Sequence, residues 1–180
     1  MLGRRLVEAF RESFEVIPAT RRELDVTSLD AVHRFVSVEL PHVIVHAAAY
    51  MDVDGCEKDP DRAHRTNGIG TRNVALAARE ADAELVYVST DFVFDGKKLE
   101  PYGEWDAPNP ISVYGASKLW GEEFTRDLLS RFYIVRTQWV FGPYGRNFVD
   151  TILSNAAKKS ELRVVTDQRG SPTYTVDLAE

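Results

Sequence analysis

The sequence predicts an α/β protein whose parallel strands form a Rossmann-like, doubly wound sheet. Short, continuously apolar runs such as Val43–Ala49 and Leu85–Ser89 are typical of strands covered on both faces. Between and after them lie longer segments, Asp61–Ala81 and Ser112–Ser130, with the spacing of amphipathic helices. Because strands alternate with helices of this length, the sequence indicates parallel βαβ units. Ligands of such sheets bind beyond the carboxyl ends of the strands, so the residues after each strand are the first candidates for a site.

The expected elements follow one another along all 180 residues, as one domain with no repeat and no linker. Leu2, Leu6 and Phe10 recur at helical spacing, so the chain opens in a helix, and Phe14–Ala19 is expected to be a short strand. The other expected elements are the helix Ser28–Leu40 capped by Thr27 or Ser28, the strands Val43–Ala49, Leu85–Ser89, Tyr133–Thr137 and Leu162–Thr166, the helices Asp61–Ala81, Ser112–Ser130 and Asn147–Lys159, and a last helix that begins near Thr175.

Composition excludes several classes of protein. The formal net charge of -6 argues against nucleic acid or an anionic membrane as the main partner. No apolar run approaches the roughly 18 residues that a membrane span needs. The single cysteine, Cys56, cannot form an internal disulfide, so the cytoplasm is the expected location. The carboxylates around Cys56 oppose formation of the thiolate, so we expect an inert thiol. A homo-oligomer is compatible with the sequence.

Tyr114 and Lys118 are the first chemical candidates, because their i, i+4 spacing in an expected helix puts both side chains on one face. A free phenol has a pKa of about 10, and a fixed ammonium nearby lowers it, so the pair suits a tuned general acid. The spacing alone also fits a surface pair on an amphipathic helix.

The strand end Ser89-Thr90-Asp91 adds context to this pair. A hydroxyl on Thr90 can hydrogen-bond a substrate oxygen while Tyr114 protonates it, although a threonine there is equally suited to a turn or a cap. A strand-end threonine, a loop rich in Gly and Pro, and Tyr-x-x-x-Lys on a helix form a more specific combination. Together they favour a catalytic set.

The residues directly after Phe14–Ala19 bear on cofactor preference. Thr20, Arg21 and Arg22 stand where NAD-selective sites usually carry an acidic residue, and an arginine suits a 2′-phosphate. A solvated charged turn is the alternative interpretation. We therefore expect NADP(H), with NAD(H) as the alternative cofactor.

Four motifs occur in one order along the chain: VSTDFVFDG, VYGASKLWGE, VRTQWVFGPYGRNFV and DQRGSPT. Together they resemble the extended short-chain dehydrogenase/reductases, and within these the dTDP-4-dehydrorhamnose reductase (RmlD-like) family. The resemblance implies a Rossmann-like fold and an NADPH-dependent reductase of a nucleotide-linked 4-keto-6-deoxysugar in deoxysugar or polysaccharide biosynthesis.

The resemblance also implies roles for single residues. The catalytic residues would be Thr90, Tyr114 and Lys118. The cofactor-binding residues would be Gly3, Thr20, Arg21, Arg22, Asp25, Val26, Ala47, Ala48, Ala49, Tyr50, Ser89, Tyr114 and Lys118. The substrate-binding residues would be Met51, Val53, Thr90 and Trp139.

The two ends depart from the family pattern. Met1-Leu2-Gly3 resembles only the last three residues of the family's glycine-rich turn, G-x-x-G-x-x-G, and members of the family continue well beyond Glu180. Residues 1–180 are therefore expected to be an NAD(P)-binding Rossmann-like domain that is incomplete at both ends, with the first strand and the C-terminal substrate region missing.

Three further interpretations account for parts of the sequence. A sugar-nucleotide dehydratase of the same superfamily would carry Glu after Thr-Asp, where this sequence has Phe92, and Arg21 and Arg22 count against the NAD-retaining epimerases. A non-catalytic regulatory subunit of a methionine adenosyltransferase belongs to the same branch; the intact catalytic set counts against it and the missing glycines favour it. No metal site is expected, because the four histidines lack ligand spacing.

Overall fold

The structure is a computed structural model that describes all of residues 1–180, and the chain divides into two compact units. The larger unit is Ala19–Arg136, and the smaller one combines Met1–Pro18 with Thr137–Glu180. Each unit is described by itself.

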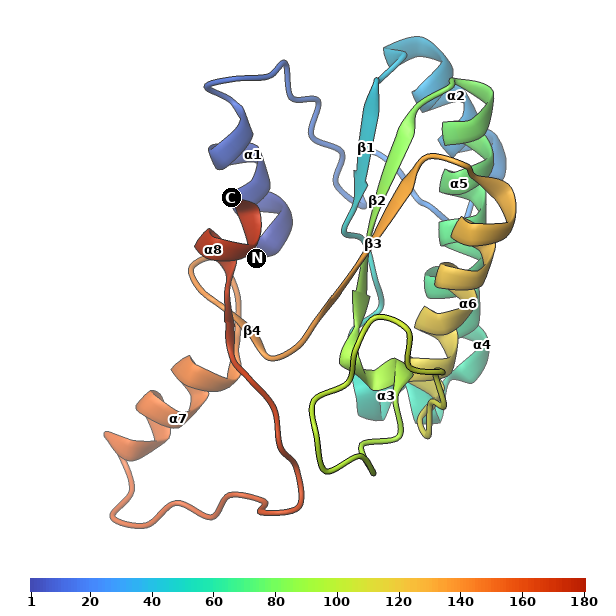
Figure 1. Cartoon of the computed structure of the whole chain (residues 1–180). Helices are drawn as coiled ribbons and strands as arrows, with labels where there is room; N and C mark the ends of the chain where they lie inside the picture. The colour runs from blue at the N-terminus through green and yellow to red at the C-terminus, as the bar shows by residue number, and fades with distance from the viewer. The chain divides into compact units, whose positions relative to one another are not determined.

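The larger unit is built on a three-stranded sheet of β1 (Val43–His46), β2 (Glu84–Thr90) and β3 (Phe132–Thr137), in that spatial order (Figure 1). Val43 pairs with Glu84 and His46 with Tyr87, so β1 and β2 are parallel. Strand β2 lies in the middle of the sheet, and its residues Leu85 and Tyr87 are fully buried. The predicted parallel α/β sheet is confirmed.

Helices α2 (Leu29–Glu39), α5 (Gly70–Glu80) and α6 (Val113–Leu128) cover one face of this sheet (Figure 1). Ser28 caps α2, because its hydroxyl accepts a hydrogen bond from the backbone N–H of Ala31. The shared core consists of aliphatic side chains, most of them alanine or valine: Val32, Val36, Val74, Ala75, Ala77 and Leu85.

The expected long helix is present, but it is not a regular α-helix. It runs through α4 (Pro60–Ala63), a π-helical segment (η1, His64–Ile69) and α5 without a break. Asp59 caps its start through the backbone N–H of Arg62, and a short helix α3 (Val53–Lys58) precedes it. A π-helical turn holds more residues than an α-helical turn, and such segments are frequent at functional sites.

The smaller unit contains α1 (Leu2–Phe10), α7 (Phe148–Ala156), α8 (Thr175–Ala179) and a parallel pair of short strands, β4 (Val140–Phe141) and β5 (Thr173–Tyr174). Helix α1 packs against α8. Asn147 caps α7 by accepting a hydrogen bond from the N–H of Asp150 at 2.9 Å.

Two expected strands are absent. Phe14–Ala19 and Leu162–Thr166 are both irregular, and their apolar side chains are exposed: Phe14 at 68% and Val165 at 63%. A strand needs a neighbour to satisfy its backbone groups and a surface to cover one face, and neither segment pairs with another strand. Strand β1 also ends at His46, before the expected Ala47–Ala49.

The covering of the sheet differs from the expectation at β1. Val43 is half exposed rather than enclosed, since the helices of the larger unit lie on one face of the sheet. No helix has the length and apolar character required to cross a lipid bilayer.

Candidate active site

The candidate site lies where β2 ends and α6 begins, at the carboxyl end of the parallel sheet. Two side chains fix the start of α6: the Ser112 hydroxyl accepts from the N–H of Gly115 at 3.1 Å, and Glu57 accepts from the N–H of Val113 at 2.8 Å. Because Glu57 belongs to α3, its carboxylate ties α3 to the helix that carries Tyr114. The position of the phenol is therefore set by two elements.

Tyr114 is half-buried, with its ring packed edge-on against Phe92 at 5.5 Å between centroids. Burial raises the pKa of Tyr114 to about 12; the Thr90 side chain lowers it in part, and Asp91 raises it further. The phenol is thus fully protonated at neutral pH. A protonated phenol suits a group that donates a proton rather than one that accepts it.

Thr90 caps a turn, the alternative role that its place at a strand end also suits. Its hydroxyl accepts from the N–H of Phe92 at 3.2 Å and so caps the 3₁₀ turn η2 (Asp91–Val93). It also donates to the Asp91 carboxylate at 3.1 Å. The same hydroxyl interacts with Tyr114, so the capping role and a place beside the phenol are compatible.

Lys118 is almost completely buried, with 2% of its surface exposed. Its ammonium donates to the carbonyl of Val88 at 2.8 Å and lies 4.2 Å from the centre of the Tyr87 ring. Burial lowers the pKa of Lys118 to about 7, and the Glu122 carboxylate opposes that fall. Its protonation is therefore balanced near neutrality.

The expected lowering of the Tyr114 pKa by Lys118 is not found in this structure. The spacing does put both residues on α6 one turn apart, but the Lys118 ammonium points to the Val88 carbonyl and the Tyr87 ring. Burial outweighs the other influences on the pKa of Tyr114, which is raised instead.

Glu122, which the sequence analysis did not single out, is fully buried beside this set. It accepts from the Ser89 hydroxyl at 2.6 Å, from Arg136 at 2.9 and 2.7 Å, and from Arg126 at 2.8 Å. Burial acts to raise the pKa of Glu122, yet the hydrogen bonds from Arg136, Ser89 and Arg126 outweigh it and leave that pKa lowered. Its position four residues after Lys118 was the available signal, because it implies a shared helix face.

Asn67 is a second buried residue that the sequence analysis missed. Its amide oxygen accepts from the N–H of Tyr50 at 2.7 Å, and its amide nitrogen donates to the Tyr50 carbonyl at 3.0 Å and to the Ser117 hydroxyl at 2.9 Å. It therefore fixes the backbone after β1 and joins it to α6. An asparagine in the middle of an expected helix was the available signal, since Asn is a poor helix former.

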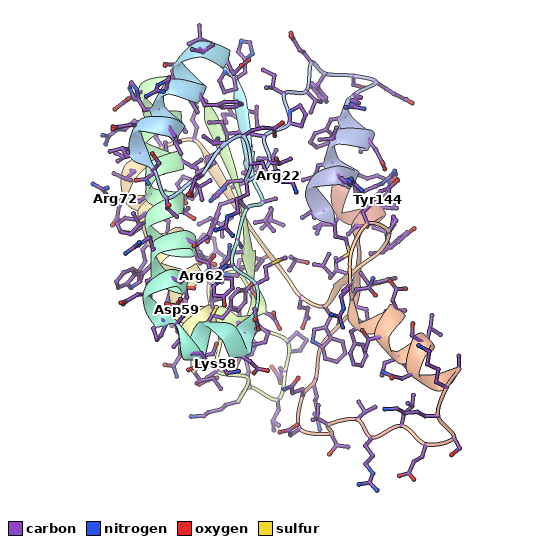
Figure 2. All side chains as sticks on the ribbon, turned by 180° about the vertical axis from the view of Figure 1, so that it is seen from behind. Arg22, Lys58, Asp59, Arg62, Arg72 and Tyr144 are labelled. Carbon is purple, nitrogen blue, oxygen red and sulfur yellow. The ribbon has the colours of Figure 1, made fainter.

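The other residues expected near a cofactor lie around this core. Ala47, Ala48 and Ala49 follow β1 as irregular chain, and the Tyr50 ring at their end is covered by the Arg62 guanidinium at 4.2 Å. Figure 2 shows Arg62 at the start of the long helix. The main chain after β1 is thus held by side chains of η1 and α4.

Thr20, Arg21 and Arg22 form an exposed turn, on which Figure 2 labels Arg22. The N–H of Thr20 donates to Glu23 at 2.7 Å. Beyond this turn, the backbone carbonyl of Val26 accepts from Asn73 of α5 at 2.9 Å.

Asp25 and the two expected substrate residues of the larger unit lie at the surface of their loops. The Asp25 carboxylate accepts from the N–H and the hydroxyl of Thr27 at 3.0 and 2.9 Å, and these bonds lower its pKa. Met51 is 69% exposed, and Val53 is the half-buried first residue of α3.

Gly3 and Trp139 belong to the smaller unit. Gly3 lies in the first turn of α1, with open space where a side chain would be. Trp139 has a left-handed backbone (φ 45°) and packs on Phe148 at 5.3 Å between ring centres. The expected catalytic residues Thr90, Tyr114 and Lys118, in contrast, all belong to the larger unit.

A family model described as the RmlD substrate-binding domain matches residues 1–180. The chain belongs to the RmlD substrate-binding domain family. The resemblance inferred from the four motifs is thereby confirmed.

Relatives of this RmlD-family chain are similar over almost its whole length. The spore coat polysaccharide biosynthesis protein SpsK of Bacillus subtilis (strain 168) is 43% identical, over 99% of this chain and 64% of SpsK. A dTDP-4-dehydrorhamnose reductase of Aggregatibacter actinomycetemcomitans is 41% identical, over 99% of this chain and 61% of that protein. The chain thus spans less than two thirds of the length of these relatives.

Solved structures confirm the predicted fold class. The crystal structure of dTDP-4-dehydrorhamnose reductase from Bacillus anthracis str. Ames in complex with NADP superimposes with a TM-score of 0.96 and 45% identity. The match covers 99% of this chain and 64% of that one.

Proposed function

We propose that residues 1–180 are the NAD(P)-binding, Rossmann-like domain of an NADPH-dependent reductase that acts on a nucleotide-linked 4-keto-6-deoxysugar. The observation that carries the proposal is the set formed by Thr90, Tyr114 and Lys118 at the carboxyl end of β2, in a chain of the RmlD family. The relatives named as dTDP-4-dehydrorhamnose reductases and as a polysaccharide biosynthesis protein support this substrate class and a place in deoxysugar or polysaccharide biosynthesis.

The residues present fit a dinucleotide. Asn67 fixes the main chain at Tyr50, directly after Ala47–Ala49, and the Lys118 ammonium lies at the Val88 carbonyl near the end of β2. We assign Ala47, Ala48, Ala49, Tyr50 and Ser89 to the nicotinamide side, Asp25 and Val26 to the adenine side, Thr20, Arg21 and Arg22 to the 2′-phosphate, and Gly3 to the pyrophosphate. The relative solved with NADP supports NADPH as the cofactor.

When bound, the reduced nicotinamide supplies the hydride for the C4 carbonyl. Tyr114 gives its phenolic proton to the carbonyl oxygen, so one hydride and one proton convert the ketone into an alcohol. Thr90, whose hydroxyl donates to Asp91 in this structure, would turn its hydrogen to the same oxygen as charge develops on it. Lys118, one helical turn after Tyr114, would hold the ribose hydroxyls of the bound cofactor. Its ammonium binds the Val88 carbonyl in this structure, so it would stabilise the phenolate left by proton transfer only after turning toward Tyr114. Met51, Val53 and Trp139 are the proposed substrate contacts.

The rival enzymes of the superfamily find less support at this site. The position after Thr-Asp, where a dehydratase would need a carboxylate, holds Phe92, whose ring packs on Tyr114. Intact Thr90, Tyr114 and Lys118 favour a catalyst over a regulatory subunit. We place the protein in the cytoplasm, a reducing compartment that suits the single cysteine of residues 1–180, Cys56.

The direct test is NADPH oxidation with dTDP-4-keto-6-deoxyhexose, with the product identified by mass spectrometry as the substrate plus two hydrogens. Tyr114→Phe should lower kcat by about two orders of magnitude or more while NADPH binding changes little, because it removes only the general acid. Tyr133→Phe, at an exposed tyrosine of β3, is the matched control and should behave as wild type. A near-normal kcat for Tyr114→Phe would contradict the proposed mechanism.

A further inference from the structure

The end of β2 is joined to α6 by three hydrogen bonds that involve the consecutive strand residues Tyr87, Val88 and Ser89. The Tyr87 hydroxyl donates to the Lys118 carbonyl at 3.2 Å, and the Lys118 ammonium donates to the Val88 carbonyl at 2.8 Å. The Ser89 hydroxyl donates to Glu122 at 2.6 Å. The Glu122 bond lies closest to Thr90, so it fixes the backbone on which the Thr90 hydroxyl stands.

Glu122 can hold this place because its charge is fully matched. Its carboxylate is completely buried and is met by Arg136 of β3 through two nitrogens and by Arg126 of α6. A buried carboxylate without such partners would be strongly unfavourable. The two guanidinium groups keep Glu122 ionised, as the lowered pKa of this carboxyl indicates.

The same carboxylate stands next to Lys118 along the helix. The titratable groups that act on Lys118 or contact it are Glu122 on α6, His46 on β1 and Tyr87 on β2, and Tyr114 lies one turn before it on α6. Burial keeps His46 neutral and lowers the pKa of Lys118, and Glu122 is the anion that opposes this lowering. Without Glu122, the buried ammonium would lose its stabilising charge.

We infer that Glu122 is a positioning residue: it fixes Ser89 and Thr90 at the end of β2, and it stabilises the ammonium of Lys118. Its part in catalysis rests on the proposed function. The two physical effects belong to the folded chain and can be measured without substrate.

The first experiment follows the titration of Lys118 by NMR in protein carrying carbon-13-labelled lysine, with the Lys118 signal assigned by Lys118→Met. Glu122→Gln removes the charge and keeps the shape of the side chain. It should lower the pKa of Lys118 by about one unit or more. Arg126→Gln is the matched control: it removes a partner of the same carboxylate but leaves the anion, so the pKa of Lys118 should stay unchanged or rise. Equal Lys118 titrations in wild type and Glu122→Gln would overturn the assignment.

A second variant covers the case in which Glu122→Gln does not fold because Arg136 is left without an anion. Glu122→Gln combined with Arg136→Gln removes the pair together, which proteins often tolerate. Removing the Arg136 cation with the anion acts on Lys118 in the opposite direction, so the Lys118 pKa should fall by less than in Glu122→Gln but stay below that of Arg136→Gln alone. Ser89→Ala tests the positional half: the methyl resonance of Thr90 should move, and an unmoved resonance would refute that half.

The kinetic arm separates this inference from the proposed function. If Lys118 must be protonated, activity declines as pH rises through its pKa, and Glu122→Gln should move that decline to lower pH while Glu122→Asp restores it. A wild-type protein without NADPH-dependent reduction would refute the proposed function alone, since the Lys118 titration would still report on Glu122. An unshifted pH profile in an active Glu122→Gln protein would refute the role of Glu122.

Discussion

Two parts of the proposed cofactor region are held in opposite ways. At the end that carries Thr90, Tyr114 and Lys118, called here the chemical end, hydrogen bonds join residues far apart in the sequence. They run from Asn67 to Ser117, from Lys118 to Val88, and from Ser89 to Glu122. At the phosphate end, the turn that carries Arg21 and Arg22 is held by bonds between near neighbours, such as Thr20 to Glu23.

This difference separates catalysis from cofactor preference. The geometry at the chemical end is a property of the folded sheet and its helices, so a substitution there affects stability and chemistry together. The phosphate-end turn contributes little to the core, so its charges can change at almost no cost to folding. Between the two regions, the Val26 carbonyl accepts a hydrogen bond from Asn73 of α5, which fixes the chain beyond the phosphate-end turn to the core.

The largest effect on stability is expected at the start of α6. A methyl group at Gly115 would overlap the carbonyl oxygen of Phe92, which is backbone and cannot rotate away. Gly115→Ala should lower the free energy of unfolding in urea by about 1–3 kcal/mol and displace Tyr114. Gly103→Ala, in an exposed loop where the added methyl group meets almost open space, should stay within about 0.5 kcal/mol of wild type. Equal losses of unfolding free energy in Gly115→Ala and Gly103→Ala would contradict the view that the start of α6 is part of the rigid chemical end.

An acid-dependent effect, of intermediate size as long as the pH stays above about 5, is expected at His46. Burial, with a contribution from the Lys118 charge, lowers the pKa of His46 to about 3, whereas an unfolded histidine has a pKa of about 6.5. Below about pH 6.5 the unfolded chain therefore binds the proton first. The free energy of unfolding should fall by up to about 1.4 kcal/mol per pH unit until the folded state is also protonated near pH 3.

Urea denaturation between neutral pH and about pH 5 measures this dependence. His46→Gln should remove this part of the acid sensitivity, while His33→Gln, at an exposed histidine paired with Glu80, should keep it. An unchanged slope in His46→Gln would show that other groups cause the acid sensitivity.

The smallest effect on stability is expected at the phosphate end. Arg21→Ala should leave the free energy of unfolding within about 0.5 kcal/mol of wild type, because Arg21 is exposed. It should nevertheless lower the NADPH/NADH ratio of kcat/KM by about tenfold, the effect of losing one charge-assisted contact to a phosphate. Arg34→Ala, at an exposed arginine of α2, should change neither quantity. An unaltered ratio in Arg21→Ala would remove Arg21 from the phosphate site.

Patterns within single elements were predictable from the sequence. The helical spacing and the Ser28 cap predicted α2, and the i, i+4 spacing correctly placed Tyr114 and Lys118 on one helix. An apolar run was not sufficient for Phe14–Ala19, because strand formation depends on a pairing partner that local sequence does not reveal.

Contacts between elements were not predictable. Nothing in the spacing of Tyr114 and Lys118 indicates that the Lys118 ammonium turns toward Val88 of another element. The bonds of Asn67 to Tyr50 and Ser117 and of Glu122 to Ser89 likewise cross 17 to 50 residues of sequence, and they form only once the sheet and helices have assembled.

The π-helical segment His64–Ile69 makes the length of the long helix as important as its composition. A π-helical turn holds about one residue more than an α-helical turn, so the segment takes up an extra residue while α4 and α5 keep their orientation on either side of it. Asn67 lies within this wide turn, where its side chain reaches Tyr50 and Ser117. Deleting one residue of the segment should let it close into regular α-helix, so that Val74 and Ala75 keep their place in the core while Asn67 loses Tyr50. Such a deletion should therefore damage the site more than the fold.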